Sequence, residues 1–231
     1  MPPSRIQGDL LRLLASHRDP ESYVAASTPL NVNAPRFSGD IDVFHDREER
    51  VAQAAEQDAA FLQERGYVLQ WLRRDPLIYT VLAARAGETT KLEWVVDSDF
   101  RFFPTVRDEM FGYVLHPVDL ATNKVAAAYG RREPRDVVDL LTIHERILPL
   151  GGVVWASVGK TVGFTPEGVI NEIRRTARCI RWLDRRECWP LSTWSPRKLS
   201  SAPSSATCRC ESISNLRLSS GPADIARAIF V

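Results

Sequence analysis

The stretch Phe37-Ser38-Gly39-Asp40-Ile41-Asp42-Val43-Phe44 is the part of the sequence that decides the fold. Its polar and apolar residues alternate with the two-residue period of a β-strand, so Ile41 and Val43 are expected to face a core. Ser38, Asp40, Asp42 and Phe44 would then point to the opposite side. Carboxylates separated by one residue on a strand lie roughly 6.5 to 7 Å apart on one face, which lets them share Mg²⁺ ions. The same pattern also occurs on exposed strand faces and in turns, so its surroundings must decide between these interpretations.

Helical and strand patterns alternate on both sides of this stretch. Apolar residues at helical spacing between Ile6 and Leu14 predict a first helix that ends near His17-Arg18-Asp19-Pro20. The pattern then predicts a short strand at 23–25, a helix at 47–65, strands at 67–72, 78–83 and 90–96, and helices at 119–129 and 135–147. We therefore expect an α/β fold, a mixed sheet with flanking helices, followed by a helical region and an irregular tail.

The composition of the chain changes near Thr176. Up to that residue there are 21 Lys and Arg against 25 Asp and Glu, whereas the remainder has 9 against 4 and also holds all four cysteines. We predict three parts: an α/β core at 1–115, a helical region at 116–176 that completes the active site, and an atypical tail at 177–231. The tail lacks a helical or strand period, and we interpret it as disordered or as the product of a lost reading frame. Cys208-Arg209-Cys210 is too closely spaced for a usual zinc site.

The bulk composition is that of an ordinary water-soluble protein. The formal net charge is +1, and no apolar run approaches the roughly 20 residues of a membrane helix. The first residues lack the apolar segment of a signal peptide, so we expect a cytoplasmic protein without a membrane partner.

Two motifs in order resemble a known family. Ala26-Ser27, a loop, and then the segment from Arg36 to Asp46 resemble the signature of polymerase-beta-like nucleotidyltransferases, in which a small-residue turn precedes an Asp-x-Asp strand. The segments 119–125 and 129–140 resemble the second signature of the AbiEii/AbiGii toxin family. Together the resemblance covers residues from about 20 to 176.

The resemblance implies roles for residues of the first motif. Asp40 and Asp42 would be catalytic metal ligands, and Ser27 would contact the β- and γ-phosphates, with Ser38 as a further nucleotide-binding residue. The family has glycine before the serine or threonine, where this chain has Ala26. If that residue needs a positive φ, alanine strains the turn by about 1 kcal/mol.

A third metal-binding carboxylate is expected on a neighbouring strand. Glu93 is the first choice because it lies in mid-strand, between Leu92 and residues that can face the core. Asp97 and Asp99 are alternatives, although aspartates at this spacing also favour a turn.

The second motif implies further site residues. Lys124 matches the family's motif lysine and would contact the triphosphate, while Arg131 and Arg135 are candidates to hold phosphate or RNA backbone. Asp136 is expected to orient Lys124 or to accept a proton. Asp139 shares its helical face, but the helix dipole explains a carboxylate near a helix start equally well.

The function implied by the resemblance is transfer of a nucleoside monophosphate from an NTP to a hydroxyl acceptor such as tRNA, with two Mg²⁺ ions as cofactors. The family further implies a toxin of a toxin–antitoxin or phage-defence system, with an antitoxin protein as partner. The competing interpretation is a nucleotide-binding remnant of that family whose catalysis is impaired by Ala26 and the altered C-terminus. Gly159-Lys160-Thr161 lacks the first glycine of a phosphate-binding loop, and His116 and His144 are interpreted as structural.

Overall fold

The computed structural model describes residues 3–32, 38–97 and 100–178, so the predicted tail lies outside the described residues apart from the end of the last helix. The elements, in chain order, are α1 (Arg5–Leu14), η1 (Ala15–His17), β1 (Ser22–Val24), α2 (Ser27–Asn31), β2 (Asp40–His45), α3 (Glu48–Glu64), β3 (Val68–Asp75), β4 (Ile78–Arg85), β5 (Glu88–Val96), β6 (Val106–Asp108), β7 (Gly112–Val114), α4 (Pro117–Arg131), α5 (Pro134–Arg146), α6 (Leu150–Lys160) and α7 (Pro166–Arg178).

The strands form one mixed seven-stranded sheet in the order β3-β4-β5-β2-β1-β7-β6. Strands β3, β4 and β5 form an antiparallel meander, and β2 then pairs with β5 in the parallel direction. Strand β1 is antiparallel to β2 and parallel to β7. The Asp-x-Asp strand therefore lies in the middle of the sheet, where both of its edges are paired.

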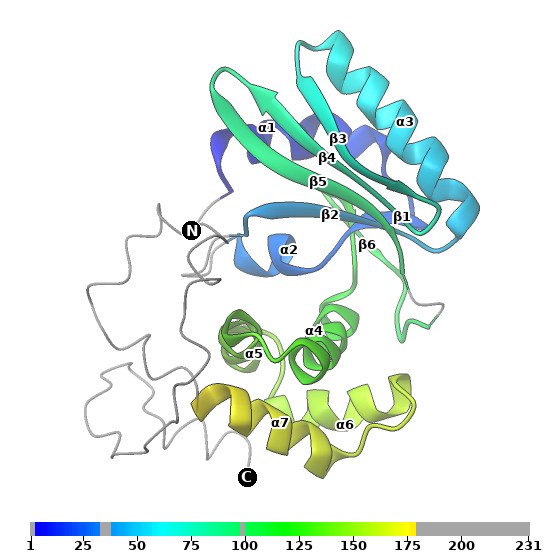
Figure 1. Cartoon of the computed structure of the whole chain (residues 1–231). Helices are drawn as coiled ribbons and strands as arrows, with labels where there is room; N and C mark the ends of the chain where they lie inside the picture. Colours follow the sequence, from blue (N-terminus) through cyan, green and yellow to red (C-terminus); the bar gives the residue numbers. More distant parts are fainter. Residues whose placement is uncertain (1–2, 33–37, 98–99, 179–231) are drawn as a thin grey trace, which may run out of the picture.

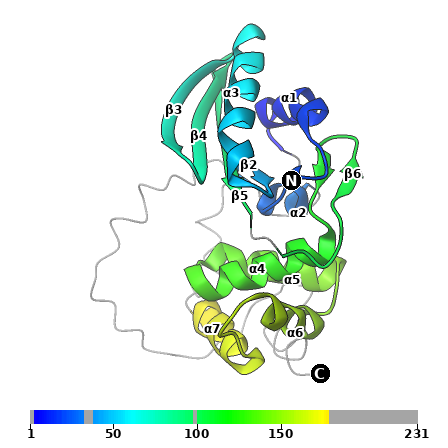
Figure 2. The same ribbon diagram turned by 90° about the vertical axis from the view of Figure 1, so that its right-hand side faces the viewer.

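Two groups of helices cover the sheet in separate layers (Figures 1 and 2). Helices α1 and α3 pack on one face, where residues such as Leu10 and Leu62 join Ile41 and Val43 of β2 in one apolar core. Helices α4 to α7 lie beyond the other side of the sheet and form a second core, with Tyr23 of β1 and Phe44 of β2 at its border. Alternation along β2 thus sends its apolar residues into one core and its carboxylates toward the helical layer.

The expected fold class is confirmed: a mixed sheet with flanking helices is followed by helices from Pro117 onward. The burial of Ile41 and Val43, each about 1% exposed, agrees with the predicted orientation of the strand. Strands β6 and β7 were not predicted, because three residues each are too few to show a period. Among the described residues, none of the helices has the length and apolar content needed to cross a bilayer.

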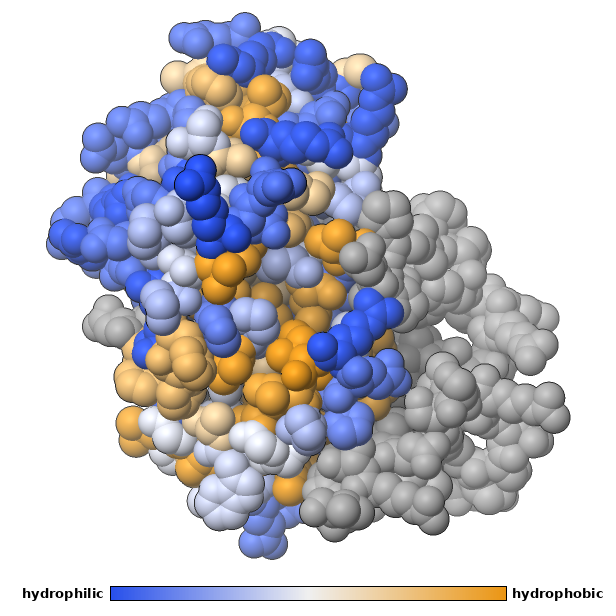
Figure 3. All heavy atoms as spheres, turned by 180° about the vertical axis from the view of Figure 1, so that it is seen from behind, coloured by the Kyte–Doolittle hydropathy of each residue, from blue (hydrophilic) through white to orange (hydrophobic). Residues whose placement is uncertain are grey.

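The helical layer has a hydrophobic core of its own. Leu140 and Ile173 are 1% and 2% exposed, and both belong to the second core. In the view from behind, polar side chains are densest over the upper half and apolar surface gathers mainly in the lower half (Figure 3). Some large apolar side chains stay at the surface, among them Phe100, Phe103 and Trp155.

A buried ionic network joins the first helices to the sheet. Asp58 of α3 accepts hydrogen bonds from His17 Nδ1 at 2.6 Å and from Trp94 Nε1 at 2.8 Å, and it also pairs with Arg18. Both members of the Arg18–Asp58 pair have side chains only 1% exposed. Burial tends to raise the pKa of Asp58, but the hydrogen bond from His17 and the charge of Arg18 outweigh it and lower the pKa. The ion pair therefore stays ionised inside the core.

His45 lies beside this network at the end of β2. The imidazole is fully buried, and neither ring nitrogen has a hydrogen-bond partner among the described residues. Burial, followed by the charges of Arg18 and Arg50, lowers the pKa of His45 to about 4, against the opposing effect of Asp58 and Asp19. The folded protein therefore holds a neutral imidazole under conditions where the unfolded chain takes up a proton.

We predict that His45 makes the fold sensitive to acid. Its folded pKa lies below the unfolded value of about 6.5, so the stability it supports is complete at pH 7.5 and is lost as the pH falls from 6.5 toward 4. The contribution lost by pH 5 is about 2 kcal/mol. Urea unfolding of the wild type and of His45→Leu at pH 7.5 and 5 measures it. If the free energy of unfolding depends equally on pH in the wild type and in His45→Leu, His45 is not the source of the acid sensitivity.

Candidate active site

The two aspartates of the predicted motif lie next to two charged residues of β5. Because β2 and β5 are parallel and in register, Asp40 is opposite Lys91 and Asp42 is opposite Glu93. Residues in register on neighbouring strands project to the same face of a sheet. Four charged side chains therefore meet on the side of the sheet that faces the helical layer.

Glu93 occupies the position expected of the third carboxylate. It accepts a hydrogen bond from Thr80 of β4 at 3.1 Å, and its side chain is 19% exposed. Of the alternatives, Asp97 accepts a hydrogen bond from the Tyr23 hydroxyl at 2.6 Å, and Asp99 lies outside the described residues.

Lys91 is a site residue that the sequence analysis missed. Its ammonium lies 3.0 Å from Asp40 Oδ2 and 3.3 Å from Glu93 Oε2. Burial tends to lower the pKa of Lys91, but the two carboxylates outweigh it and raise the pKa, so the ammonium remains charged. The sequence did contain one indication of this: Lys91 lies two residues before Glu93, so both side chains project from the same face of the strand.

Negative charge remains in excess at Asp42. Burial, followed by the charges of Glu93 and Asp40, raises the pKa of Asp42 to about 7, against the opposing effect of Lys91. This is the expected response of a carboxyl group crowded by like charges in a partly desolvated position.

Carboxylate oxygens are the ligands that Mg²⁺ prefers, and an excess of negative charge favours a divalent cation. By donor chemistry, Asp40, Asp42 and Glu93 therefore fit the metal that the sequence motif implies. Across residues 3–32, 38–97 and 100–178, however, no group of three or more His, Cys, Asp or Glu side chains is already arranged to hold a metal ion.

A second polar cluster joins α2 to the helical layer. The Lys124 ammonium on α4 lies 2.5 Å from Ser27 Oγ and 2.7 Å from Asp139 Oδ2. Asn31, which the sequence analysis did not single out, donates to the Ser27 carbonyl at 2.9 Å and to Asp139 Oδ1 at 3.2 Å. Lys124, Asn31 and Asp139 are each less than 5% exposed. Burial of a lysine in mid-helix, where surface exposure is usual, indicates that its partners hold it there.

Thr28 connects this cluster to the carboxylates. Its hydroxyl lies 2.7 Å from the Asp40 carbonyl oxygen and 3.2 Å from the Ser38 hydroxyl. Ser38 Oγ is itself 3.1 Å from the Asp40 carbonyl oxygen. Helix α2 therefore contacts the start of β2 through Thr28 and contacts Lys124 through the adjacent Ser27.

Asp139, rather than Asp136, is the carboxylate that contacts Lys124. Asp136 accepts a hydrogen bond from Arg131 at 2.8 Å, and its second oxygen is buried without a partner among the described residues. Arg135 is half-buried near the start of α5 and forms no ion pair with another described residue. His116 and His144 each accept a backbone hydrogen bond, from Val118 and Leu150 respectively.

Ala26, which precedes Ser27, has the backbone conformation that the sequence analysis suspected. Its φ of 60° and ψ of −134° fall in a region that side chains disfavour and glycine adopts readily. The strain occurs directly before the residue that contacts Lys124.

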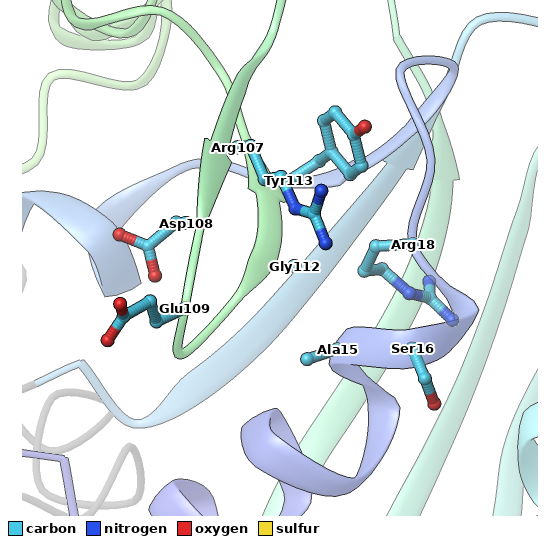
Figure 4. A pocket seen from close by; sticks show the side chains of 8 residues that line it. All are labelled: Ala15, Ser16, Arg18, Arg107, Asp108, Glu109, Gly112 and Tyr113. Atoms are coloured by element: carbon cyan, nitrogen blue, oxygen red, sulfur yellow. The ribbon is translucent and has the colours of Figure 1, made fainter.

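A cavity of about 800 Å³ lies elsewhere, between the segment after α1 and the β6–β7 hairpin. Figure 4 shows Arg107 and Tyr113 of the hairpin on one side and Arg18 and Ala15 on the other. None of the four charged residues at the β2–β5 pair lines this cavity. It is therefore separate from the candidate site.

No family model and no curated protein matches the chain. Among solved structures, the chain is similar to MenT4, a nucleotidyltransferase toxin from Mycobacterium tuberculosis, with 18% identity, 84% of each chain covered and a TM-score of 0.49. It is also similar to a protein from H. pylori described as a nucleotidyltransferase, with 15% identity, 77% of this chain and 92% of that chain covered, and a TM-score of 0.47. Cid1, an RNA terminal uridylyl transferase, covers 61% of this chain and 38% of its own at 15% identity and a TM-score of 0.32. These identities and TM-scores are low, so the function has to be argued from the residues of the site.

We predict that Ala26→Gly stabilises the protein. Glycine removes the clash of Cβ at positive φ, which outweighs the greater freedom of glycine in the unfolded chain, and the expected net gain is about 1 kcal/mol. Urea unfolding measures the change. Ala60→Gly, at an exposed position inside α3, serves as the matched control and should lose about 1 kcal/mol. A loss of stability in Ala26→Gly would show that the turn is unstrained.

Proposed function

We propose that the chain is a metal-dependent nucleotidyltransferase that moves a nucleoside monophosphate from an NTP to a hydroxyl acceptor, of which the 3′ end of a tRNA is the first candidate. One arrangement carries this proposal: the β2–β5 register gathers Asp40, Asp42 and Glu93, and α2 links that group to Lys124. Carboxylates that can hold Mg²⁺ and a buried ammonium linked to them through α2 are the groups that a triphosphate requires.

Each group has a role set by its chemistry. Asp40, Asp42 and Glu93 would hold Mg²⁺, which when bound neutralises phosphate charge and lowers the pKa of the attacking hydroxyl. Lys124 and the Ser27 hydroxyl would bind phosphate oxygens as a point charge and a hydrogen-bond donor. Asp139 accepts from Lys124 and so fixes the direction of its ammonium. Arg131, which is half exposed and bound to Asp136, would hold phosphate or RNA backbone.

The biological setting follows the sequence resemblance: a toxin of a toxin–antitoxin or phage-defence system, neutralised by an antitoxin protein. Incubation of the purified chain with each labelled NTP, total tRNA and Mg²⁺ is the decisive experiment, because it identifies both the nucleotide and the acceptor.

The second candidate is a nucleotide-binding remnant with impaired catalysis, and the conformation of Ala26 is the observation that favours it. Strain before Ser27 would displace the hydroxyl that contacts Lys124. The two candidates differ in a simple assay, since a remnant retains binding of Mg²⁺-NTP but transfers no label to RNA.

We predict that Asp40→Asn and Asp42→Asn each abolish label transfer while the protein stays folded. The carboxylates act on the transition state through the metal and are not part of the apolar core, so a loss of at least about a hundredfold is expected. Scintillation counting of labelled tRNA measures transfer, and circular dichroism checks the fold. Asp75→Asn on the exposed part of β3 is the control and should keep full activity. Near-normal transfer by either site variant would remove that residue from the metal site.

Loss of the Lys124 charge is predicted to raise the KM for NTP more than it lowers kcat. A buried carboxylate left without its cation destabilises a protein by about 3 kcal/mol or more, so Lys124→Met is best made together with Asp139→Asn. Steady-state kinetics of the double variant and of Asp139→Asn alone separate the two effects. If the double variant binds NTP like the wild type, Lys124 does not contact the triphosphate.

A further inference from the structure

We propose that the Lys91 ammonium takes the place of a second divalent cation between Asp40 and Glu93, so that the three carboxylates together bind one divalent ion. This inference rests on the proposed function and departs from the two-ion site that the sequence resemblance implies. It concerns the number of ions that these strands can hold.

The first step is the position of the ammonium. Lys91 Nζ lies 3.0 Å from Asp40 Oδ2 and 3.3 Å from Glu93 Oε2, so it bridges one carboxylate of β2 and one of β5. A Mg²⁺ ion shared by the same two oxygens would need to lie about 2.1 Å from each. Both cations cannot occupy that space. Lys91 thus excludes an ion from the space between Asp40 Oδ2 and Glu93 Oε2.

The second step is the stiffness of this arrangement. Lys91 is opposite Asp40, and Glu93 is opposite Asp42, in a parallel pairing that runs without interruption from Asp40 to His45. Strand β5 is also paired along its other edge with β4. The Cα and Cβ atoms of Lys91 are therefore held opposite Asp40, because moving them away would break the backbone hydrogen bonds between β2 and β5.

The third step is the balance of charge. Asp40, Asp42 and Glu93 carry three negative charges when ionised, and Lys91 supplies one positive charge. The remaining charge of −2 matches a single divalent ion. Lys91 pairs with both Asp40 and Glu93, whereas Asp42 forms no ion pair with a described cation and its side chain hydrogen-bonds that of Glu93. Asp42 would therefore be a principal ligand of the single ion.

The test counts ions in the nucleotide complex. Full-length protein is dialysed to equilibrium against Mn²⁺ and each of the four non-hydrolysable NTP analogues, and the excess of Mn²⁺ and of nucleotide in the protein compartment is measured. We expect one Mn²⁺ per bound nucleotide in the wild type and two in Lys91→Met, in which the Asp40–Glu93 position is vacated.

Two variants serve as controls. Lys91→Arg keeps a cation between the strands and should stay at one ion. Arg73→Met removes an exposed cation of β3 that pairs with the exposed Asp75, and should also stay at one. Circular dichroism confirms that each variant is folded.

Two Mn²⁺ per nucleotide in the wild type, or one in Lys91→Met, would overturn the role of Lys91 and leave nucleotidyl transfer intact. Retention of neither nucleotide nor Mn²⁺ by the wild type would overturn the proposed function, and the one-ion site with it. The two failures are thus distinguished by whether nucleotide is retained.

Discussion

The parallel pairing of β2 with β5 is the constraint on which the rest of the candidate site depends. A parallel pair fixes which residues are neighbours, and a shift by one residue would turn every side chain of β2 to the other face. In the observed register, Asp40 and Asp42 meet Lys91 and Glu93, while Ile41 and Val43 enter the core under α1 and α3. The same interaction therefore builds the hydrophobic core on one face and collects the charges on the other.

Helix α2 connects the β2–β5 pair to the helical layer. It is only five residues long, but its first residues contact the carbonyl of Asp40 on one side and Lys124 on the other. The two cores of the molecule meet across this short element. The strained Ala26 immediately precedes it, so the position of Ser27 is obtained at a cost in backbone energy.

Buried charges serve two different purposes in this protein. Around Asp58, three donors satisfy one carboxylate completely, and the network joins α3 to β5 and to the segment after α1. At the candidate site the balance is incomplete, because Asp42 and Glu93 are crowded together and Lys91 offsets only part of their charge. Satisfied networks stabilise a fold, whereas crowded like charges cost stability and persist where a ligand can relieve them. This contrast separates the structural ion pairs from those of the site.

Local pattern was enough to predict strands β1 to β5 and, in the helical layer, helices α4 and α5. The alternation in 37–44 predicted the strand, its buried face and the shared face of Asp40 and Asp42, because a strand period is a local property of the chain. The helices at α1, α3, α4 and α5 follow equally from apolar spacing and from their proline and glycine boundaries. Strands β6 and β7 were not predicted, because each is defined by pairing with other strands and not by a pattern within its own three residues.

The sequence by itself determined the element types, the outward face of the Asp-x-Asp strand and the suspicion that Ala26 needs a positive φ. Which polar groups meet depends on the tertiary structure: Lys91 pairs with Asp40 and Glu93, Thr28 donates to the Asp40 carbonyl, and Asp139 rather than Asp136 contacts Lys124. Asp136 and Asp139 share a helical face, so their spacing cannot distinguish them. The packing of α5 against α2 makes that choice, because contacts between segments more than a hundred residues apart depend on how the layers are stacked and not on any local period.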